Sequence, residues 1–257
     1  DATSISGQAQ ASEFGFALTF ALVGPNGEPE QTVRTAHGAV TMHADGSYVY
    51  TPDHGFFGSD SFAFRASDGA LTTDATTVTV TVDPVAPVAQ DGTLSGAEDS
   101  GPIQGQAHAS EINNDPLTYA LVGADGEQTL KTAHGTVTMQ SDGNYSYRPD
   151  PGYVGPDSFG YTAFDAANGT TSNTATITVN VAPVAPTVTT PVISGTAQEG
   201  HTLTASATSG QADNPVSYTW YSSADDYTHP IGTGATYVVQ ESDENHQIEV
   251  KATATNA

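Results

Sequence analysis

The chain has 257 residues, of which 29 are Asp or Glu and only 5 are Lys or Arg, so its formal net charge is −24 at pH 7. Nucleic acids and anionic membrane surfaces are bound through Lys and Arg, and we therefore exclude nucleic acid as a partner. The absence of cysteine excludes a disulfide framework and a thiolate metal site. No stretch approaches the roughly 18 apolar residues of a membrane-spanning helix, which excludes direct membrane insertion.

The first predicted unit, residues 1–84, consists of short strands separated by turns. Apolar and polar residues alternate in the segments 48–50, 62–64 and 76–82, as in strands with one buried face. Asp45-Gly46 stands between two alternating runs, which is a strong signal for a β-hairpin. No helical period extends beyond a turn.

A second predicted unit, residues 85–184, repeats the first. Without a gap, residues 132–159 are identical to residues 35–62 at 18 of 28 positions, and an alternating run at 174–181 closes the unit. A repeat spacing of about 97 residues is the length of a small domain. The sequence therefore predicts an all-β fold of tandem antiparallel β-sandwich domains, immunoglobulin-like or cadherin-like, in an extended array.

A third predicted unit, residues 185–257, is also a sandwich but has a different sequence. Pro-rich joints at 83–88 and 181–186 are short and stiff. Trp220, the only Trp, falls in a strand where an immunoglobulin-like sandwich buries one. The predicted strands of this unit are 188–194, 202–207, 216–221, 236–239 and 248–254.

The two outer units are predicted to be truncated. Residues 1–7 align with residues 99–105, so the first unit lacks the stretch that precedes Asp99 in the second. The third unit ends after one long predicted strand, where a sandwich is expected to have one more. We therefore expect the chain to be part of a longer one.

The ordered motifs of these units resemble the bacterial immunoglobulin-like and cadherin-like tandem repeats of large secreted or surface adhesins of the RTX type. The second unit carries them at Glu98-Asp99, Leu117–Tyr119, His134–Val137, Asp142–Pro149 and Gly155–Phe159. The first unit matches from His37 to Phe62, and the third resembles another immunoglobulin-like module of such proteins. The resemblance implies an extracellular protein at the bacterial surface.

Calcium is the predicted cofactor. Calcium takes six to eight oxygen ligands, and the segment 111–115 offers Glu111, Asn113 and Asp115 at alternate positions before a strand. Glu98 and Asp99 lie beside a joint. By resemblance, Asp157 and Asp165 occupy positions where cadherin-like repeats hold acids. The alternative is that these acids form only a solvated surface. The equivalent loop of the first unit, residues 13–17, keeps one acid, and we expect no metal site there.

The sequence offers no catalytic constellation, and we predict that the chain is not an enzyme. No nucleophile elbow, phosphate loop or helical pair of zinc-binding His residues occurs. His37 and His134 recur before a Gly and a strand, where a structural role is the expectation.

The predicted function is that of a spacer and adhesion module, stiffened by calcium, whose partners are the neighbouring repeats of the parent chain. The alternative is a glycan- or polysaccharide-binding module of the same kind of protein, with Tyr221 and Tyr227 as aromatic platforms. A third possibility is an accessory repeat of a secreted hydrolase.

Overall fold

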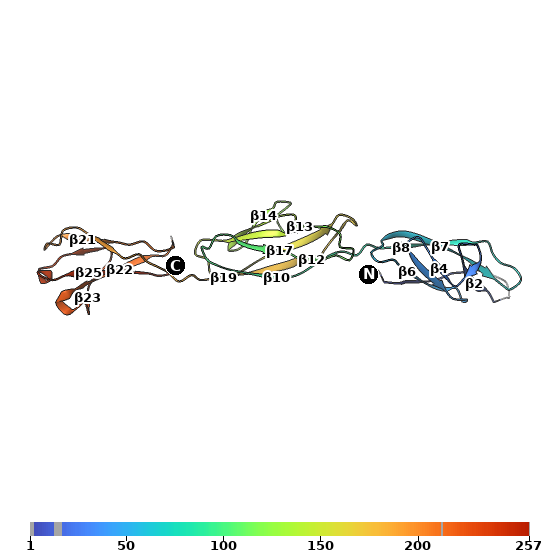
Figure 1. Cartoon of the computed structure of the whole chain (residues 1–257), viewed down its shortest axis with the longest axis horizontal. Coiled ribbons are helices and arrows are strands. Elements are labelled where there is room, and N and C mark those ends of the chain that lie inside the picture. Colours follow the sequence, from blue (N-terminus) through green and yellow to red (C-terminus); the bar gives the residue numbers. More distant parts are fainter. Residues whose placement is uncertain (1–2, 13–16, 212, 257) are drawn as a thin grey trace.

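The computed structural model describes residues 3–12, 17–211 and 213–256. Three β units follow one another along one long axis (Figure 1). Within the described residues, helical structure is limited to two single-turn 3₁₀ helices, η1 (Ser223–Asp225) and η2 (Glu241–Asp243). The prediction of an all-β fold with antiparallel sheets in tandem domains is confirmed. The Pro-rich joints have no regular structure at residues 83–87 and 183–187.

The first unit packs two sheets against each other. One sheet has the order β1-β6-β5-β4 and the other the order β3-β2-β7-β8. The predicted Asp-Gly hairpin joins β5 to β6, with Gly46 at a φ of 87°, a conformation that Gly adopts without steric cost. The strands are β1 (Ile5–Gln8), β2 (Thr19–Val23), β3 (Pro29–Glu30), β4 (Thr32–Arg34), β5 (Gly38–Met42), β6 (Ser47–Pro52), β7 (Gly58–Ser67) and β8 (Thr76–Val82).

The second unit repeats this architecture and adds strands at its beginning. Its sheets have the orders β11-β16-β15-β14 and β10-β19-β17-β13, with β18 beside β17 and a small β12-β9 pair. The strands are β9 (Val88–Ala89), β10 (Gly92–Ala97), β11 (Ile103–Gln106), β12 (Ala109–Ser110), β13 (Leu117–Leu121), β14 (Thr129–Lys131), β15 (Gly135–Met139), β16 (Asn144–Pro149), β17 (Gly155–Asp165), β18 (Thr170–Thr171) and β19 (Ala175–Ala182).

Strand β10 forms the edge of one sheet of the second unit. It pairs in parallel with β19, from Gly92 opposite Ile177 to Ala97 opposite Ala182, and its Leu94 is buried in the core. The Tyr161 hydroxyl also lies 2.6 Å from the carbonyl oxygens of both Gln90 and His108. These contacts fasten the beginning of the unit to its sheet.

The third unit is a smaller sandwich of two three-stranded sheets, β20-β21-β24 and β23-β22-β25. Trp220 is fully buried in its core, where the indole N–H donates to the Gly234 carbonyl at 2.8 Å. The ring lies 5.7 Å from that of Tyr237. The strands are β20 (Val192–Ser194), β21 (Thr202–Ser206), β22 (Val216–Ser222), β23 (Pro230–Thr233), β24 (Thr236–Val238) and β25 (Ile248–Ala254).

Candidate metal centre

Three acidic residues meet at the end of the second unit that faces the first. Glu111 and Asp115 belong to the loop between β12 and β13, and Asp165 is the last residue of β17. The antiparallel register places Asp165 opposite Leu117, the first residue of β13. The loop that precedes β13 and the end of β17 therefore lie at the same edge of the sheet.

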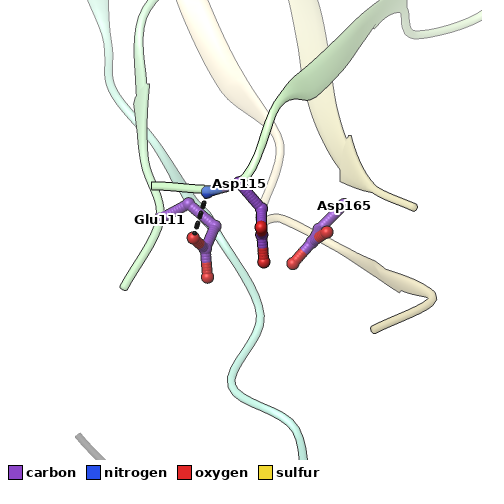
Figure 2. A group of neighbouring side chains, drawn as sticks. All are labelled: Glu111, Asp115 and Asp165. Atoms are coloured by element: carbon purple, nitrogen blue, oxygen red, sulfur yellow. Dashed lines mark hydrogen bonds between the residues drawn. The ribbon is translucent and has the colours of Figure 1, made fainter. Parts of the chain in front are cut away.

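The three carboxylates lie side by side (Figure 2). Each contributes one oxygen to a group in which all these oxygens lie within 4.8 Å of one another. Glu111 also organises its own loop, because its Oε2 accepts the backbone N–H groups of Asn113 at 2.6 Å and Asp115 at 2.9 Å. Asn114 closes this turn with a φ of 58°, a left-handed conformation that Asn tolerates. The backbone thus presets the positions of two of the three acids.

Two oxygens of this group are buried without a hydrogen-bond donor. They are Glu111 Oε1 and Asp165 Oδ2, and Asp165 is 0% exposed. Its other oxygen accepts the Ala167 N–H at 2.8 Å. Buried carboxylate oxygens without partners are costly, and so are like charges at this separation. A bound cation removes both costs.

The donor set fits a hard divalent cation. It consists of carboxylate oxygens, with no His among the grouped residues, and oxygen-only sites of this kind suit calcium or magnesium. Calcium accepts irregular geometry with more ligands, whereas magnesium demands a near-ideal octahedron. If calcium binds here, Glu111, Asp115 and Asp165 hold it, and backbone carbonyls or water complete its coordination.

The acidic loop also touches the first unit. The Asn113 amide donates to the Gly55 carbonyl across the joint at 3.2 Å. Asn168, just beyond β17, donates to the Val85 carbonyl in the joint at 3.2 Å. Asn113 was predicted from sequence as a metal ligand, and the structure gives its amide nitrogen this contact between units. Asn168 was not predicted, because only the three-dimensional arrangement brings it to the joint.

Glu98 and Asp99 lie at the opposite end of the second unit, beside the joint to the third. Glu98 is 3% exposed, and its Oε1 accepts the Val184 N–H and the Asn256 side-chain amide, both at 2.7 Å. Asp99 Oδ2 lies 3.3 Å from the Gln211 side-chain nitrogen. The structure therefore does not bring this pair together with Glu111, Asp115 and Asp165. It places the pair in a polar network between the second and third units.

Asp157 lies apart from the acidic group, and its oxygens already have donors. Its Oδ2 accepts from the Thr132 hydroxyl at 2.6 Å, the Tyr147 hydroxyl at 2.7 Å and the His134 N–H at 3.1 Å. Burial alone raises the pKa of the Asp157 carboxyl, but hydrogen bonds from Thr132, Tyr147, Ser158 and His134 together hold this pKa below its usual value. The carboxylate thus serves as a buried structural acceptor.

The first unit contains the same buried acceptor. Asp60 Oδ2 accepts from Thr35 at 2.6 Å, from Tyr50 at 2.8 Å and from the His37 N–H at 3.0 Å. Burial and the adjacent carboxylate raise the pKa of Tyr50 to about 12. This network explains why Thr, His, Tyr and Asp recur at matched positions in the two units. We predicted that the loop at residues 13–17 of the first unit holds no metal site. Residues 13–16 of this loop lie outside the described residues.

The recurring His side chains stack on aromatic rings. His37 lies over Phe56 with ring centroids 4.3 Å apart, and His134 lies over Tyr153 at 4.1 Å; both pairs are almost parallel. Their backbone N–H groups hold the Asp carboxylates described above. This geometry favours a structural role for both residues.

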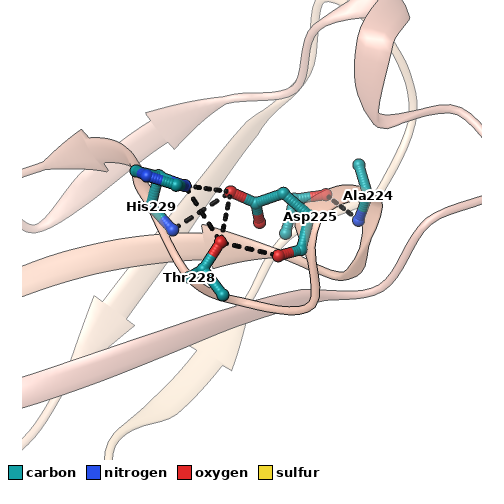
Figure 3. A network of polar contacts seen from close by, with 5 residues as sticks. Ala224, Asp225, Thr228 and His229 are labelled. Atoms are coloured by element: carbon teal, nitrogen blue, oxygen red, sulfur yellow. Dashed lines mark hydrogen bonds and ion pairs between the residues drawn. The ribbon is translucent and has the colours of Figure 1, made fainter.

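The third unit contains a Thr-His-Asp group formed by the last residue of η1 and the turn that follows it (Figure 3). His229 Nδ1 lies 2.9 Å from the Thr228 hydroxyl and 3.1 Å from Asp225 Oδ2. Both contacts are made by the same ring nitrogen. A catalytic triad requires one ring nitrogen for the acid and the other for the nucleophile, so this group stabilises a turn and lacks the triad arrangement.

The two predicted sugar-binding residues share one surface hollow. Tyr221 and Tyr227 line it together with Glu249 and Lys251, and the Tyr227 hydroxyl donates to the Gln247 side chain at 3.1 Å.

Among the described residues, no helix has the length and apolar character needed to span a membrane.

Comparison with protein-family models matches the bacterial cadherin-like domain to residues 3–84 and again to residues 85–183. The search of curated proteins gave no match. Among solved structures, the chain is similar to human CDH23 EC21-23, with 16% identity, coverage of 91% of this chain and 88% of that chain, and a TM-score of 0.38. Protocadherin Gamma B7 extracellular cadherin domains 1-4 share 13% identity, with coverage of 88% and 66% and a TM-score of 0.34. An endo-fucoidan hydrolase from glycoside hydrolase family 107 shares 23% identity over 66% of this chain, with a TM-score of 0.25, and the chain spans 24% of that hydrolase.

Proposed function

Because the chain belongs to the family of bacterial cadherin-like domains, we propose that it is a non-enzymatic spacer segment of a large extracellular adhesin at the bacterial surface. In this role, the domains hold a distal binding domain away from the cell, and their immediate partners are the neighbouring repeats. The further proposal is that calcium orders the joint between the first two units.

The acidic group at that joint carries the calcium proposal. Two of its oxygens are buried without donors, and its loop supplies Asn113, which contacts Gly55 of the first unit. In the absence of an ion, repulsion among the three carboxylates favours opening of the loop. Opening displaces Asn113 and frees the joint. With calcium bound, the loop closes and the two units keep one relative orientation.

The test is calcium titration of the full chain by calorimetry, with magnesium as the competing ion. We expect one calcium site, with the millimolar to submillimolar affinity that is usual in extracellular modules. Small-angle scattering is expected to show a longer, narrower distribution of distances in calcium than in chelator. Binding without a change in scattering would remove the role of calcium at the joint while leaving the metal site. Absence of binding would remove both.

A glycan-binding role is a second candidate, favoured by the hollow that Tyr221 and Tyr227 share. Aromatic rings provide stacking surfaces for sugars, and the adjacent Glu249 and Lys251 provide hydrogen-bonding groups. This candidate predicts binding to a glycan array that is lost in Tyr221→Ala. A spacer role alone predicts no signal on any array.

A further inference from the structure

One loop recurs at matched positions in the first two units. In the first unit it consists of residues 52–56, Pro-Asp-His-Gly-Phe, at the end of β6. In the second unit it consists of residues 149–153, Pro-Asp-Pro-Gly-Tyr, at the end of β16. We call these two segments the socket loops. Each of them lies at the end of its unit that faces the following unit.

Each socket loop is held in one conformation by its own unit. In the first unit, the Asp53 N–H donates to the His37 carbonyl at 2.8 Å, and the Phe56 N–H donates to the Asp53 carbonyl at 3.1 Å. The ring of Phe56 also stacks on His37. The second unit repeats these three contacts with Asp150, Tyr153 and His134. The loops are therefore shaped before a neighbouring unit contacts them, which lowers the cost of docking.

The glycine of each socket loop lies against a side chain of the following unit. A Cβ atom added to Gly55 would lie 2.5 Å from Cγ of Asn113 and would overlap its side-chain oxygen. A Cβ atom added to Gly152 would overlap Oδ2 of Asp213. Within the described residues, Gly55 and Gly152 are the two glycines at which a Cβ atom would meet a side chain of another unit.

The conformation of these glycines does not explain this contact. Gly55 and Gly152 have φ values of 72° and 69°, which favour glycine in any turn. Gly27 and Gly126 also have positive φ values, 79° and 89°, yet no described atom lies within 4 Å of a Cβ atom added to either. Positive φ thus occurs in this chain without a close neighbour, and the space beside Gly55 and Gly152 is filled by the next unit.

The two residues that fill these spaces are alike in chemistry and in position. Asn113 lies in the loop before β13, and Asp213 lies shortly before β22. Both have short side chains that end in a planar polar group. The Asn113 amide also donates to the Gly55 carbonyl at 3.2 Å, and Asp213 lines a surface hollow together with Pro151 of the socket loop. The same kind of contact therefore occurs at both joints.

We propose that the socket loops are docking sites for the unit that follows in the chain. The glycine leaves room for one Asn or Asp side chain from a loop that precedes a strand of the next unit, and this contact fixes the orientation of that unit. The inference adds to the proposed spacer role. It stands without the calcium site, because Asp213 is not one of the three grouped acids. It also assigns the stacked His residues a purpose, which is to hold the socket loops.

The first test measures spin-label distances across the second joint in chelator. The chain has no cysteine, so Thr178→Cys on β19 and Thr204→Cys on β21, both at exposed positions, carry the labels. Gly152→Ala is expected to displace Asp213 and so to broaden or shift the distance distribution. Gly126→Ala is the matched control with the same positive φ and free space, and it is expected to leave the distribution unchanged. Equal distributions in these two variants would overturn the proposal.

A second set of variants changes the docked side chain and leaves the socket loop unstrained. Asp213→Ala empties the socket and is expected to broaden the distribution, whereas Asp213→Asn keeps the size and one oxygen and is expected to preserve it. Adding Gly152→Ala to Asp213→Ala is expected to cause no further broadening, because the clashing atoms are already absent. Equal behaviour of Asp213→Ala and Asp213→Asn, or a fully additive effect of Gly152→Ala, would overturn the proposal.

The first joint is tested in 10 mM calcium with labels at Thr79→Cys and Thr178→Cys. Gly55→Ala is expected to broaden the distribution, whereas Gly27→Ala, its matched control, is expected to preserve it. Scanning calorimetry verifies that every variant remains folded. Equal distributions in Gly55→Ala and Gly27→Ala would overturn the claim that both joints share one kind of socket. Because the second joint is measured in chelator, failure of the calcium proposal and failure of this one are distinguishable.

Discussion

Replacing Asp165 with Asn is expected to have opposite effects on the stability of the second unit with and without calcium. The residue is fully buried, and one of its oxygens has no donor. Without an ion, its charge therefore destabilises the folded unit. With calcium bound, the same charge is a ligand. The substitution keeps the shape of the side chain, removes the charge and replaces one carboxylate oxygen with an amide nitrogen.

The stabilisation that Asp165→Asn is expected to give in chelator follows from the spacing of the carboxylates. Two like charges no more than 4.8 Å apart repel by at least roughly 3 kcal/mol at an effective dielectric constant of about 20. Relaxation of the half-buried Glu111 and Asp115 side chains reduces the gain from relieving this repulsion. We expect Asp165→Asn to stabilise the unit in chelator by about 1–2 kcal/mol, which raises its Tm by roughly 5–15 °C for a domain of this size.

The stability that the native chain gains in calcium follows from the affinity of the site for the ion. A site with a Kd of about 0.1 mM stabilises the folded unit by about 2.7 kcal/mol at 10 mM calcium. The native chain gains this stability, whereas Asp165→Asn gains little. The order of the two Tm values is therefore expected to reverse between chelator and calcium.

Scanning calorimetry of the full chain in chelator and in 10 mM calcium measures this reversal. Trp220 lies in the third unit, so its fluorescence follows that unit separately. Asp157→Asn is the matched control, because Asp157 lies on the same strand but its oxygens have donors. It is expected to destabilise the unit in both conditions. Destabilisation by Asp165→Asn in chelator would refute the reasoning about its unpaired charge.

Three further outcomes are expected from the contacts outside the acidic group. Because the pKa of Asp157 is lowered in the folded state, its contribution to stability is present above its unfolded pKa and is lost as the pH falls through its folded pKa. In an acid titration, the free energy of unfolding is therefore expected to fall less steeply in Asp157→Asn than in the native chain. Tyr161→Phe loses the hydroxyl contacts to two backbone carbonyls, and it is expected to lower the free energy of unfolding by about 1–2 kcal/mol in urea unfolding. The matching residue of the first unit is Phe64, which shows that the ring itself fits. Glu98→Ala is expected to broaden spin-label distances between the second and third units, whereas Glu98→Gln retains the Oε1 acceptor and is expected to preserve them; equal behaviour of the two variants would contradict the role of that oxygen.

Local sequence patterns predicted the strands well where alternation was strong. The run predicted at 76–82 coincides with β8, and the run at 248–254 coincides with β25. In the predicted strand 188–194, only Val192–Ser194 is a regular strand, because Pro191 lacks an N–H for the ladder. Strand β23 was not predicted, since Pro230–Thr233 shows no alternation. The parallel pairing of β10 with β19 joins residues about 85 positions apart, beyond the reach of local patterns.

The candidate site was only partly predictable for a related reason. The loop acids at 111 and 115 are close in sequence, so their spacing indicated an oxygen-rich loop. Asp165 was included only through family resemblance, because it reaches the loop through the register of β17 against β13. Asp157 has the same residue type on the same strand, yet its donors come from residues 10 to 25 positions away. Sequence alone did not distinguish the satisfied carboxylate from the unsatisfied one.

The parallel pairing of β10 with β19 has a mechanical consequence for a chain under tension. Strand β10 starts beside the first joint, and β19 ends beside the second. A pull on the two ends of the second unit therefore acts along both strands in opposite directions. All six residue pairs from Gly92–Ile177 to Ala97–Ala182 bear the load in shear and must fail together, whereas a hairpin pulled open at one end loses its bonds one at a time. The backbone hydrogen bonds between β10 and β19 thus resist extension of the second unit along its long axis.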